Sequence, residues 1–279
     1  MIQNEFLQET KIGKINFLPG GKTNSQISFG GGNIDLADKD NLSTPQNTTN
    51  KILISGELFF HEELLMESTG LKNSLRKKND SKAFFGLADT KDYTNTSYND
   101  YIINLPDKKR KISSSNSTGR VFEISYSKVT NDFSLSVIHT YLTLYYQIES
   151  LFFFKDKKEY LLRIGKVFVL FYQKEHEGLK YIEIGIQYEN KQFESHLFPE
   201  TQSPISIGRT NCLLNINHSS VSKQHAIIEF SHGSKTFYYK DLKSTNGSIL
   251  IMKEDDSIRI KGEMKFKVED VPFKLWEMP

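Results

Sequence analysis

The chain has 279 residues, 37% of them hydrophobic, with a formal net charge of +2, so it is long enough for one or two domains with a sizeable core. This small net charge excludes a strong general attraction to nucleic acid or to membrane surfaces. The single cysteine, Cys212, excludes an internal disulfide and multi-cysteine zinc sites, and it suits a reducing compartment.

The first residues, MIQNEFLQETKIGK (1–14), lack the continuous apolar run of a signal peptide. No segment approaches the roughly 18 apolar residues of a membrane helix. We therefore expect an intracellular protein without membrane contact. The expected location is the cytoplasm, the cytoskeleton or a cilium, with the nucleus as the alternative.

Residues 1–50 are predicted to be extended or disordered, because most of this segment is dense in Gly, Asn, Ser, Thr and Pro. Within it, LPGGKTNSQISFGGG (18–32) resembles the Pro-Gly-Gly-x-Ser/Thr segments of small microtubule-associated proteins of the Jupiter and SPIRAL1 kinds. The resemblance implies an extended peptide on a tubulin lattice. It makes tubulin, or other subunits of an assembly, a candidate partner of residues 1–50.

Residues 51–118 are predicted to hold one short helix and a polar linker. Ser55 is a candidate N-cap, and apolar residues such as Leu65 and Met66 in GELFFHEELLMES (56–68) can share a helix face. In the linker, KKRK (108–111) is a nuclear-import address, a nucleic-acid contact or a solvated run, and we favour the last.

From residue 121 onward the apolar residues follow a period of two. In YIEIGIQY (181–188) isoleucines alternate with Glu183, Gly185 and Gln187. Many short segments of this kind, separated by turn clusters such as STNG and KEDD, predict an all-β sandwich or barrel. We assign 119–177 to a β-rich extension and 178–279 to a C-terminal domain. The sequence leaves open whether these are two β units or one enlarged unit.

Three fragments follow one another in the C-terminal part: IGR (207–209), SVSKQHA (220–226) and DLKSTNGS (241–248). Their order and spacing resemble the forkhead-associated (FHA) domain, whose pattern is Gly-Arg, then Ser-x-x-His-Ala, then Ser-Thr-Asn-Gly. The family carries these fragments on loops at one end of an eleven-strand β-sandwich. The resemblance covers about residues 178–279, and it implies an FHA-type β-sandwich that binds phosphothreonine peptides.

The chemistry of the residues agrees with this resemblance. A phosphothreonine carries about −1.5 to −2 charges and three acceptor oxygens. The Arg209 guanidinium offers paired donors that fit such oxygens, Ser222 adds a hydroxyl and a loop amide, and Lys223 adds a second cation. These three residues are the predicted phosphate receptor.

The resemblance also implies that Thr245 and Asn246 hold the backbone of the bound peptide. Gly208, His225 and Gly247 are expected to be structural, with His225 bracing the loops. The chain departs from the family pattern at two places. Lys223 stands where many members have arginine, and an asparagine that often follows the Asn-Gly pair is absent from SILIM (248–252).

No enzyme, cofactor or metal site is predicted. The sequence contains no nucleophile elbow, Walker loop, kinase signature or His-Glu-x-x-His motif. The spacing of Cys212, His218 and His225 fits no zinc pattern. We therefore expect a non-enzymatic adaptor that binds a phosphothreonine-containing protein. The alternative is a structural subunit of a cytoskeletal or ciliary assembly, with the sandwich as its scaffold.

Overall fold

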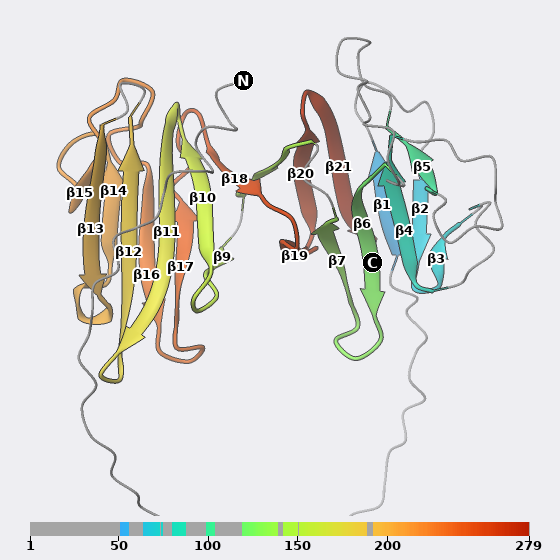
Figure 1. Ribbon diagram of the computed structural model, residues 1–279, viewed down its shortest axis with the longest axis horizontal. Helices are drawn as coiled ribbons and strands as arrows, with labels where there is room; N and C mark the ends of the chain where they lie inside the picture. Colours follow the sequence, from blue (N-terminus) through green and yellow to red (C-terminus); the bar gives the residue numbers. More distant parts are fainter. Residues whose placement is uncertain are drawn as a thin grey trace, which may run out of the picture. The chain divides into compact units, whose positions relative to one another are not determined.

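The computed structural model describes a chain built almost entirely of β-strands (Figure 1). All described residues lie in the unit Asn47–Pro279. They are residues 51–55, 64–72, 74, 80–87, 99–103, 119–138, 142–149, 151–188 and 192–278. The expectations for residues 1–50 and for KKRK (108–111) concern segments outside this set.

An eleven-stranded antiparallel sheet runs through the whole unit. In spatial order its strands are β13 (Phe193–Pro199), β12 (Leu179–Gln187), β11 (Val167–His176), β10 (Glu159–Ile164), β18 (Ser248–Met252), β8 (Leu144–Gln147), β20 (Glu263–Val268), β21 (Val271–Met278), β1 (Lys51–Ser55), β2 (Leu64–Glu67) and β3 (Gly70–Leu71).

Two five-stranded sheets pack against this long sheet. One has the order β15 (Leu214–Asn215), β14 (Ile205–Gly208), β16 (Ala226–Ser231), β17 (Thr236–Asp241) and β9 (Phe152–Phe153). The other has the order β5 (Tyr101–Ile102), β4 (Lys82–Gly86), β6 (Arg120–Ser127), β7 (Asp132–Val137) and β19 (Ser257–Arg259). A 3₁₀ turn, η2 (Glu200–Gln202), follows β13.

The period-two pattern explains these layers. In β11, Val167, Val169 and Phe171 are buried while the residues between them are partly exposed, as a strand with one face on a core requires. The Phe154 and Phe171 rings lie 5.3 Å apart, and Phe171 lies 5.9 Å from Tyr239 of the facing sheet. We call the sandwich formed by β9–β18 the second sandwich.

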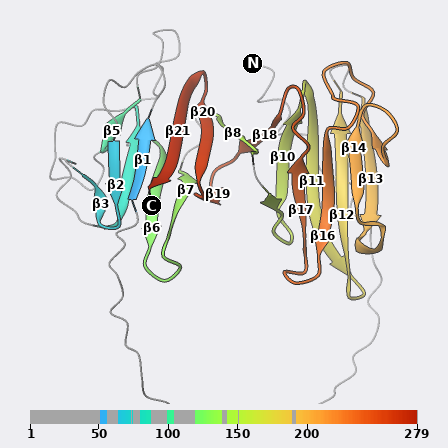
Figure 2. The ribbon, with the colours of Figure 1, turned by 180° about the vertical axis from the view of Figure 1, so that it is seen from behind.

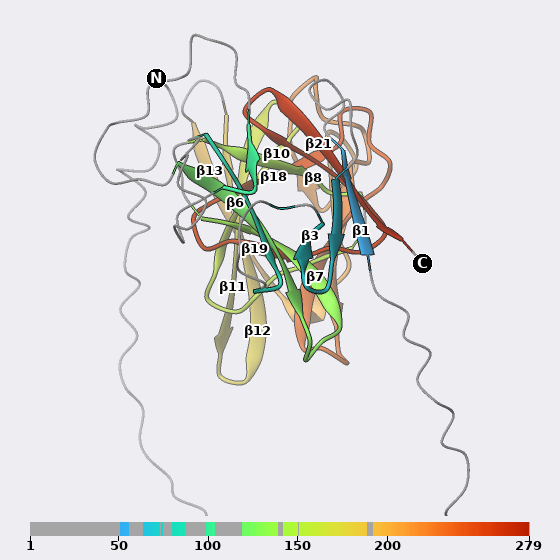
Figure 3. The ribbon, with the colours of Figure 1, turned by 90° about the vertical axis from the view of Figure 1, so that its right-hand side faces the viewer.

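The remaining strands, β1–β8 and β19–β21, form the first sandwich. Its core is also aromatic, because the Phe122 ring lies 5.3 Å from Phe266 and 5.5 Å from Phe273 of the facing sheet. The N-terminal and C-terminal strands of the described chain meet in this sandwich, where β1 pairs with β21 (Figures 1 and 3).

The two sandwiches have the same strand connectivity. The five-stranded sheets correspond strand by strand, and each has a parallel pair at one edge, β14–β15 or β4–β5. The long sheet reads β18-β10-β11-β12-β13 in one direction from its central pair and β8-β20-β21-β1-β2 in the other. The β10–β11 and β20–β21 hairpins correspond as well, since each turns on a residue with positive φ, Gly165 at 62° and Glu269 at 54°. The described chain therefore contains two copies of one fold.

Along the chain, the strands of this fold occur in the same order twice, in residues 51–176 and again in residues 179–278. The last three strands of each stretch lie in the sandwich that the other stretch mainly forms. β9–β11 close the second sandwich, where β10 pairs with β18 and β11 with β12 (Figure 2). β19–β21 close the first sandwich, where β20 pairs with β8 and β21 with β1. The two sandwiches are therefore joined through their closing strands and through the β8–β18 pair.

The all-β prediction is confirmed, and three of the local assignments differ from the structure. The helix expected after Ser55 is wrong where the structure describes the chain, because Leu64–Glu67 is strand β2 and its Met66 pairs with Ile52 of β1. The strand pairing and burial of Met66 outweigh the local helix propensity of this segment. The stretch 51–118, assigned to a short helix and a polar linker, supplies β1–β5. Strands β10–β11 share one sandwich with β12–β18 across the boundary expected at residue 178.

Candidate functional site

All eight residues singled out in the FHA-like fragments come together at one end of the second sandwich. Three loops bring them there: the loop after β14, the loop between β15 and β16, and the loop between β17 and β18. Ile207 pairs with Ala226, which pairs with Asp241 on its other side, so the three loops leave neighbouring strands at one level.

Gly208 is required at its position because two loops approach each other closely. A Cβ atom at Gly208 would lie 2.2 Å from the Lys223 carbonyl oxygen and 2.8 Å from the Cys212 sulfur. The next amide, that of Arg209, donates a 2.9 Å hydrogen bond to the Ser222 carbonyl. Glycine therefore allows the Arg209 and Ser222 loops to touch, which is a packing requirement rather than a left-handed turn.

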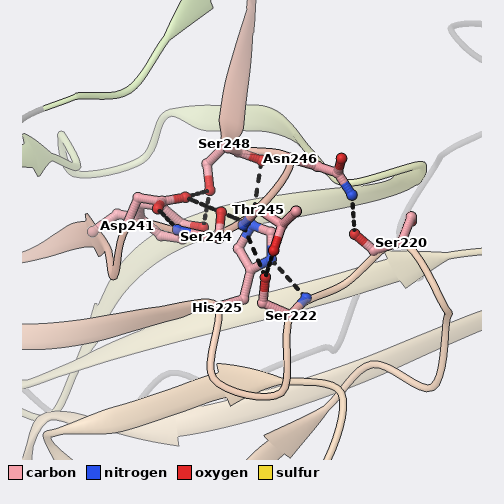
Figure 4. A network of polar contacts seen from close by, with 10 residues as sticks. Ser220, Ser222, His225, Asp241, Ser244, Thr245, Asn246 and Ser248 are labelled. Atoms are coloured by element: carbon pink, nitrogen blue, oxygen red, sulfur yellow. Dashed lines mark hydrogen bonds and ion pairs between the residues drawn. The ribbon is translucent and has the colours of Figure 1, made fainter.

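His225 is fully buried and braces the site (Figure 4). Its Nδ1 accepts a hydrogen bond from the Ser222 amide at 3.2 Å, so the proton of the neutral ring is on Nε2. Nε2 lies 2.9 Å from Ser244 Oγ and 3.3 Å from the Gly247 carbonyl oxygen, and one ring thus connects two loops. Burial lowers the pKa of His225, although nearby Asp241 and the Gly247 carbonyl act in the opposite direction. The lowered pKa keeps the imidazole neutral.

Asp241 is the carboxylate that holds this network together, and the sequence did not single it out. Its carboxylate accepts hydrogen bonds from the Ser244 amide at 2.7 Å, the Ser244 hydroxyl at 2.9 Å and the Ser248 hydroxyl at 2.5 Å. Ser248 is bonded in turn to the buried Tyr239 hydroxyl at 2.6 Å. The signal was present, because an aspartate followed three residues later by a serine is typical of a side-chain-capped turn.

Ser222, Thr245 and Asn246 form the outer layer of the site (Figure 4). The Thr245 amide donates to Ser222 Oγ at 3.1 Å, and the two hydroxyl oxygens lie 3.4 Å apart. The Asn246 side chain donates to the Ser220 carbonyl at 2.8 Å. These bonds hold the two loops together, and Thr245 and Asn246 remain exposed to solvent.

Two cations complete the arrangement. Arg209 is half-buried and Lys223 is exposed, and neither side chain has an ion-pair or hydrogen-bond partner among the residues that the structure describes. The carboxylate of the network, Asp241, accepts hydrogen bonds from Ser244 and Ser248 instead. A guanidinium, an ammonium and two hydroxyls on braced loops suit an anion with several oxygen acceptors.

A family comparison agrees with this geometry. The family model of the FHA domain matches residues 205–264. The chain contains an FHA domain. FHA domains are protein-interaction modules that bind phosphopeptides and are not catalytic. No curated protein matches the chain.

The FHA match crosses from one sandwich into the other. It begins at β14 and includes the three loops and β18, but its last part comprises β19 and the start of β20, which lie in the first sandwich. In the second sandwich their places are taken by β9 and β10. The FHA fold is therefore complete in space but not within the matched stretch of sequence.

The first sandwich has the FHA-like connectivity without the receptor residues. Gly86 matches Gly208, since its Cβ would lie 2.5 Å from the Gly119 carbonyl oxygen, and the Leu87 amide donates to that carbonyl as Arg209 does to Ser222. Leu87 thus stands in the place of Arg209, and Val121 in the place of His225. In the described chain, the combination of cation and bracing histidine exists only in the second sandwich.

The described residues contain no cluster of three or more His, Cys, Asp or Glu side chains placed to hold a metal ion. Within the same residues, no helix is long and apolar enough to span a membrane.

Proposed function

We propose that the protein is a non-enzymatic adaptor that docks to a phosphothreonine-containing protein through the FHA site of its second sandwich. The observation that carries this proposal is the pair of cations Arg209 and Lys223, which have no side-chain partner in the described part of the chain. They lie beside the Ser222 hydroxyl on loops that His225 braces.

Each residue has a distinct part in the proposed complex. Arg209 grips two phosphate oxygens with its paired donors, and Lys223 contributes charge without a fixed geometry. Ser222 turns its hydroxyl from Thr245 Oγ1, 3.4 Å away, to the phosphate, while its oxygen keeps the Thr245 amide. Thr245 and Asn246 then offer exposed polar groups to the peptide backbone.

In this proposal the first sandwich supports the FHA site. It shares the long sheet with the FHA site and lacks Arg209 and His225 equivalents, so it can hold the receptor rigidly without competing for the same peptide.

The direct test is fluorescence polarisation of the full chain with a degenerate phosphothreonine peptide library and its unphosphorylated counterpart. Phosphate-dependent binding is expected, with an Arg209→Ala loss of at least about tenfold, because each charge-assisted hydrogen bond contributes about 1.5–3 kcal/mol. Lys235→Gln, in the exposed β16–β17 turn, removes the same charge elsewhere and serves as the control. Binding that persists in Arg209→Ala, or that needs no phosphate, contradicts the proposal.

A further inference from the structure

An open pocket lies on the outer face of the long sheet, where the two halves of the chain meet. Its volume is about 400 Å³. Strands of both halves line it, β10 and β18 from the second sandwich and β8 and β20 from the first. Its polar lining includes Tyr145, Gln147, Arg163, Lys265 and Lys267. Because the pocket needs β8 beside β18, it is a product of how this chain joins its two sandwiches.

Arg163 is the unusual residue of the pocket. Its Nε is buried and has no hydrogen-bond partner among the residues that the structure describes. Its guanidinium lies 5.9 Å from the centre of the Tyr145 ring, and none of the described residues forms an ion pair with it. Because Arg163 lines the open pocket and is only half-buried, its guanidinium can be neutralised by an anion that enters from outside the chain.

The other charges around Arg163 leave room for such an acceptor. Lys265 already pairs with Glu149 and Glu263, whereas Lys267 is exposed and has no partner within the described residues. Two carboxylates also line the pocket, those of Glu269 and Asp270. Glu269 accepts the Thr143 amide at 2.9 Å instead of pairing with Arg163.

The pocket adjoins the FHA site. A Cβ atom at Gly247 would begin 3.7 Å from the amide nitrogen of Gln147, which lines the pocket. Arg163 pairs with Ile249, two residues beyond Gly247. With about 3.3 Å per residue along a strand and about 4.8 Å between strands, the pocket is within reach of a few residues of an extended peptide held at Asn246.

We propose that this pocket is a second anion subsite, in which Arg163 takes the carboxylate of an acidic residue near the phosphothreonine of the same peptide. The inference rests on the proposed function, because the phosphothreonine must first be held at Arg209. A planar guanidinium and a planar carboxylate form two parallel hydrogen bonds, and the half-buried Arg163 side chain lines the pocket in which such a pair would form. The subsite would give the protein a preference for acidic phosphothreonine sequences.

The test uses the full chain and phosphothreonine peptides in which one aspartate is moved through each flanking position in turn. Wild-type protein is expected to prefer the aspartate peptide over its asparagine counterpart by about tenfold at one position. In Arg163→Gln the two peptides should bind equally. Arg163→Lys should keep only part of the wild-type preference, because an ammonium cannot form the two parallel hydrogen bonds of a guanidinium. Lys235→Gln controls for net charge, and thermal unfolding verifies that each variant is folded.

Two failures are distinguishable. If phosphothreonine peptides bind through Arg209 and the aspartate preference is absent, or is equal in Arg163→Gln and Lys235→Gln, the subsite is refuted and the FHA site stands. If no phosphothreonine peptide binds, the proposed function and the subsite are both overturned.

Discussion

The exchange of closing strands predicts which fragments of the chain carry a working FHA site. A fragment of residues 142–252 contains β8 and all of β9–β18, so it keeps every strand of the second sandwich. A fragment of residues 178–279 contains the whole family match but lacks β9–β11. We expect the first fragment to fold and bind as the full chain does, and the second to be strongly destabilised.

The magnitude follows from the side chains that β10 and β11 bury. These are Tyr160, Leu162, Ile164, Val167, Val169 and Phe171, all at most 6% exposed. At about 1.5–3 kcal/mol for each fully buried large apolar side chain, their loss removes on the order of 10 kcal/mol, as an upper estimate. A typical domain has a total stability of about 5–15 kcal/mol. The 178–279 fragment therefore loses most or all of its stability unless other strands replace the missing ones.

The hairpin β20–β21 is the obvious replacement, and one contact opposes it. A Cβ atom at Gly165 would lie 2.5 Å from the Ser220 carbonyl oxygen, in the loop next to the receptor, and the equivalent residue of β20–β21 is Glu269. Refilling the gap with this hairpin would push a side chain into that loop. Overpacking of this kind costs about 1–3 kcal/mol.

Urea unfolding followed by circular dichroism, together with fluorescence polarisation of a phosphothreonine peptide, measures both fragments against the full chain. The reasoning is refuted if residues 178–279 fold and bind like the full chain while residues 142–252 do not. That result would mean that β19–β21 close the FHA sandwich.

Three further predictions concern the site itself. Titration calorimetry should give one phosphothreonine peptide per chain, because the first sandwich has Leu87 and Val121 where the second has Arg209 and His225; a stoichiometry of two would contradict this. Gly208→Ala should lower stability by about 1–3 kcal/mol and weaken peptide binding, since its Cβ would meet the Lys223 carbonyl at 2.2 Å, whereas Gly233→Ala, with nothing within 4 Å, should do neither. The folded chain has a lowered His225 pKa, so on acidification the unfolded chain binds a proton at this histidine at a higher pH than the folded chain does. The stability that His225 contributes is therefore present above about pH 6.5 and is lost as the pH falls below it. Urea unfolding between pH 7 and pH 5 should show this loss, and His225→Gln should remove that part of the slope; an unchanged slope would exclude the linkage.

Much of the proposed site could be predicted from the sequence, because phosphate recognition would restrict the residue types. A guanidinium, a hydroxyl and an ammonium in the order Arg209, Ser222, Lys223 limit the chemistry before any fold is known. The bracing role of His225 also agrees with its bonds to the Ser222 amide and to the β17–β18 loop. Asp241 was missed because its importance comes from Ser248 and Ser244 converging on it, which depends on the loop conformation.

The alternation of apolar and polar residues determined by itself that most of the chain is β-strand, because a period of two places one face of each strand on a core. It could not determine which strands pair. Segments 159–171 and 263–275 are both amphipathic hairpins with turns at equivalent places, and either pattern can pair with a strand such as β18. Only the tertiary structure selects between them, through long-range register and contacts such as that of Gly165 with Ser220. The same selection places β8 beside β18 and creates the pocket around Arg163.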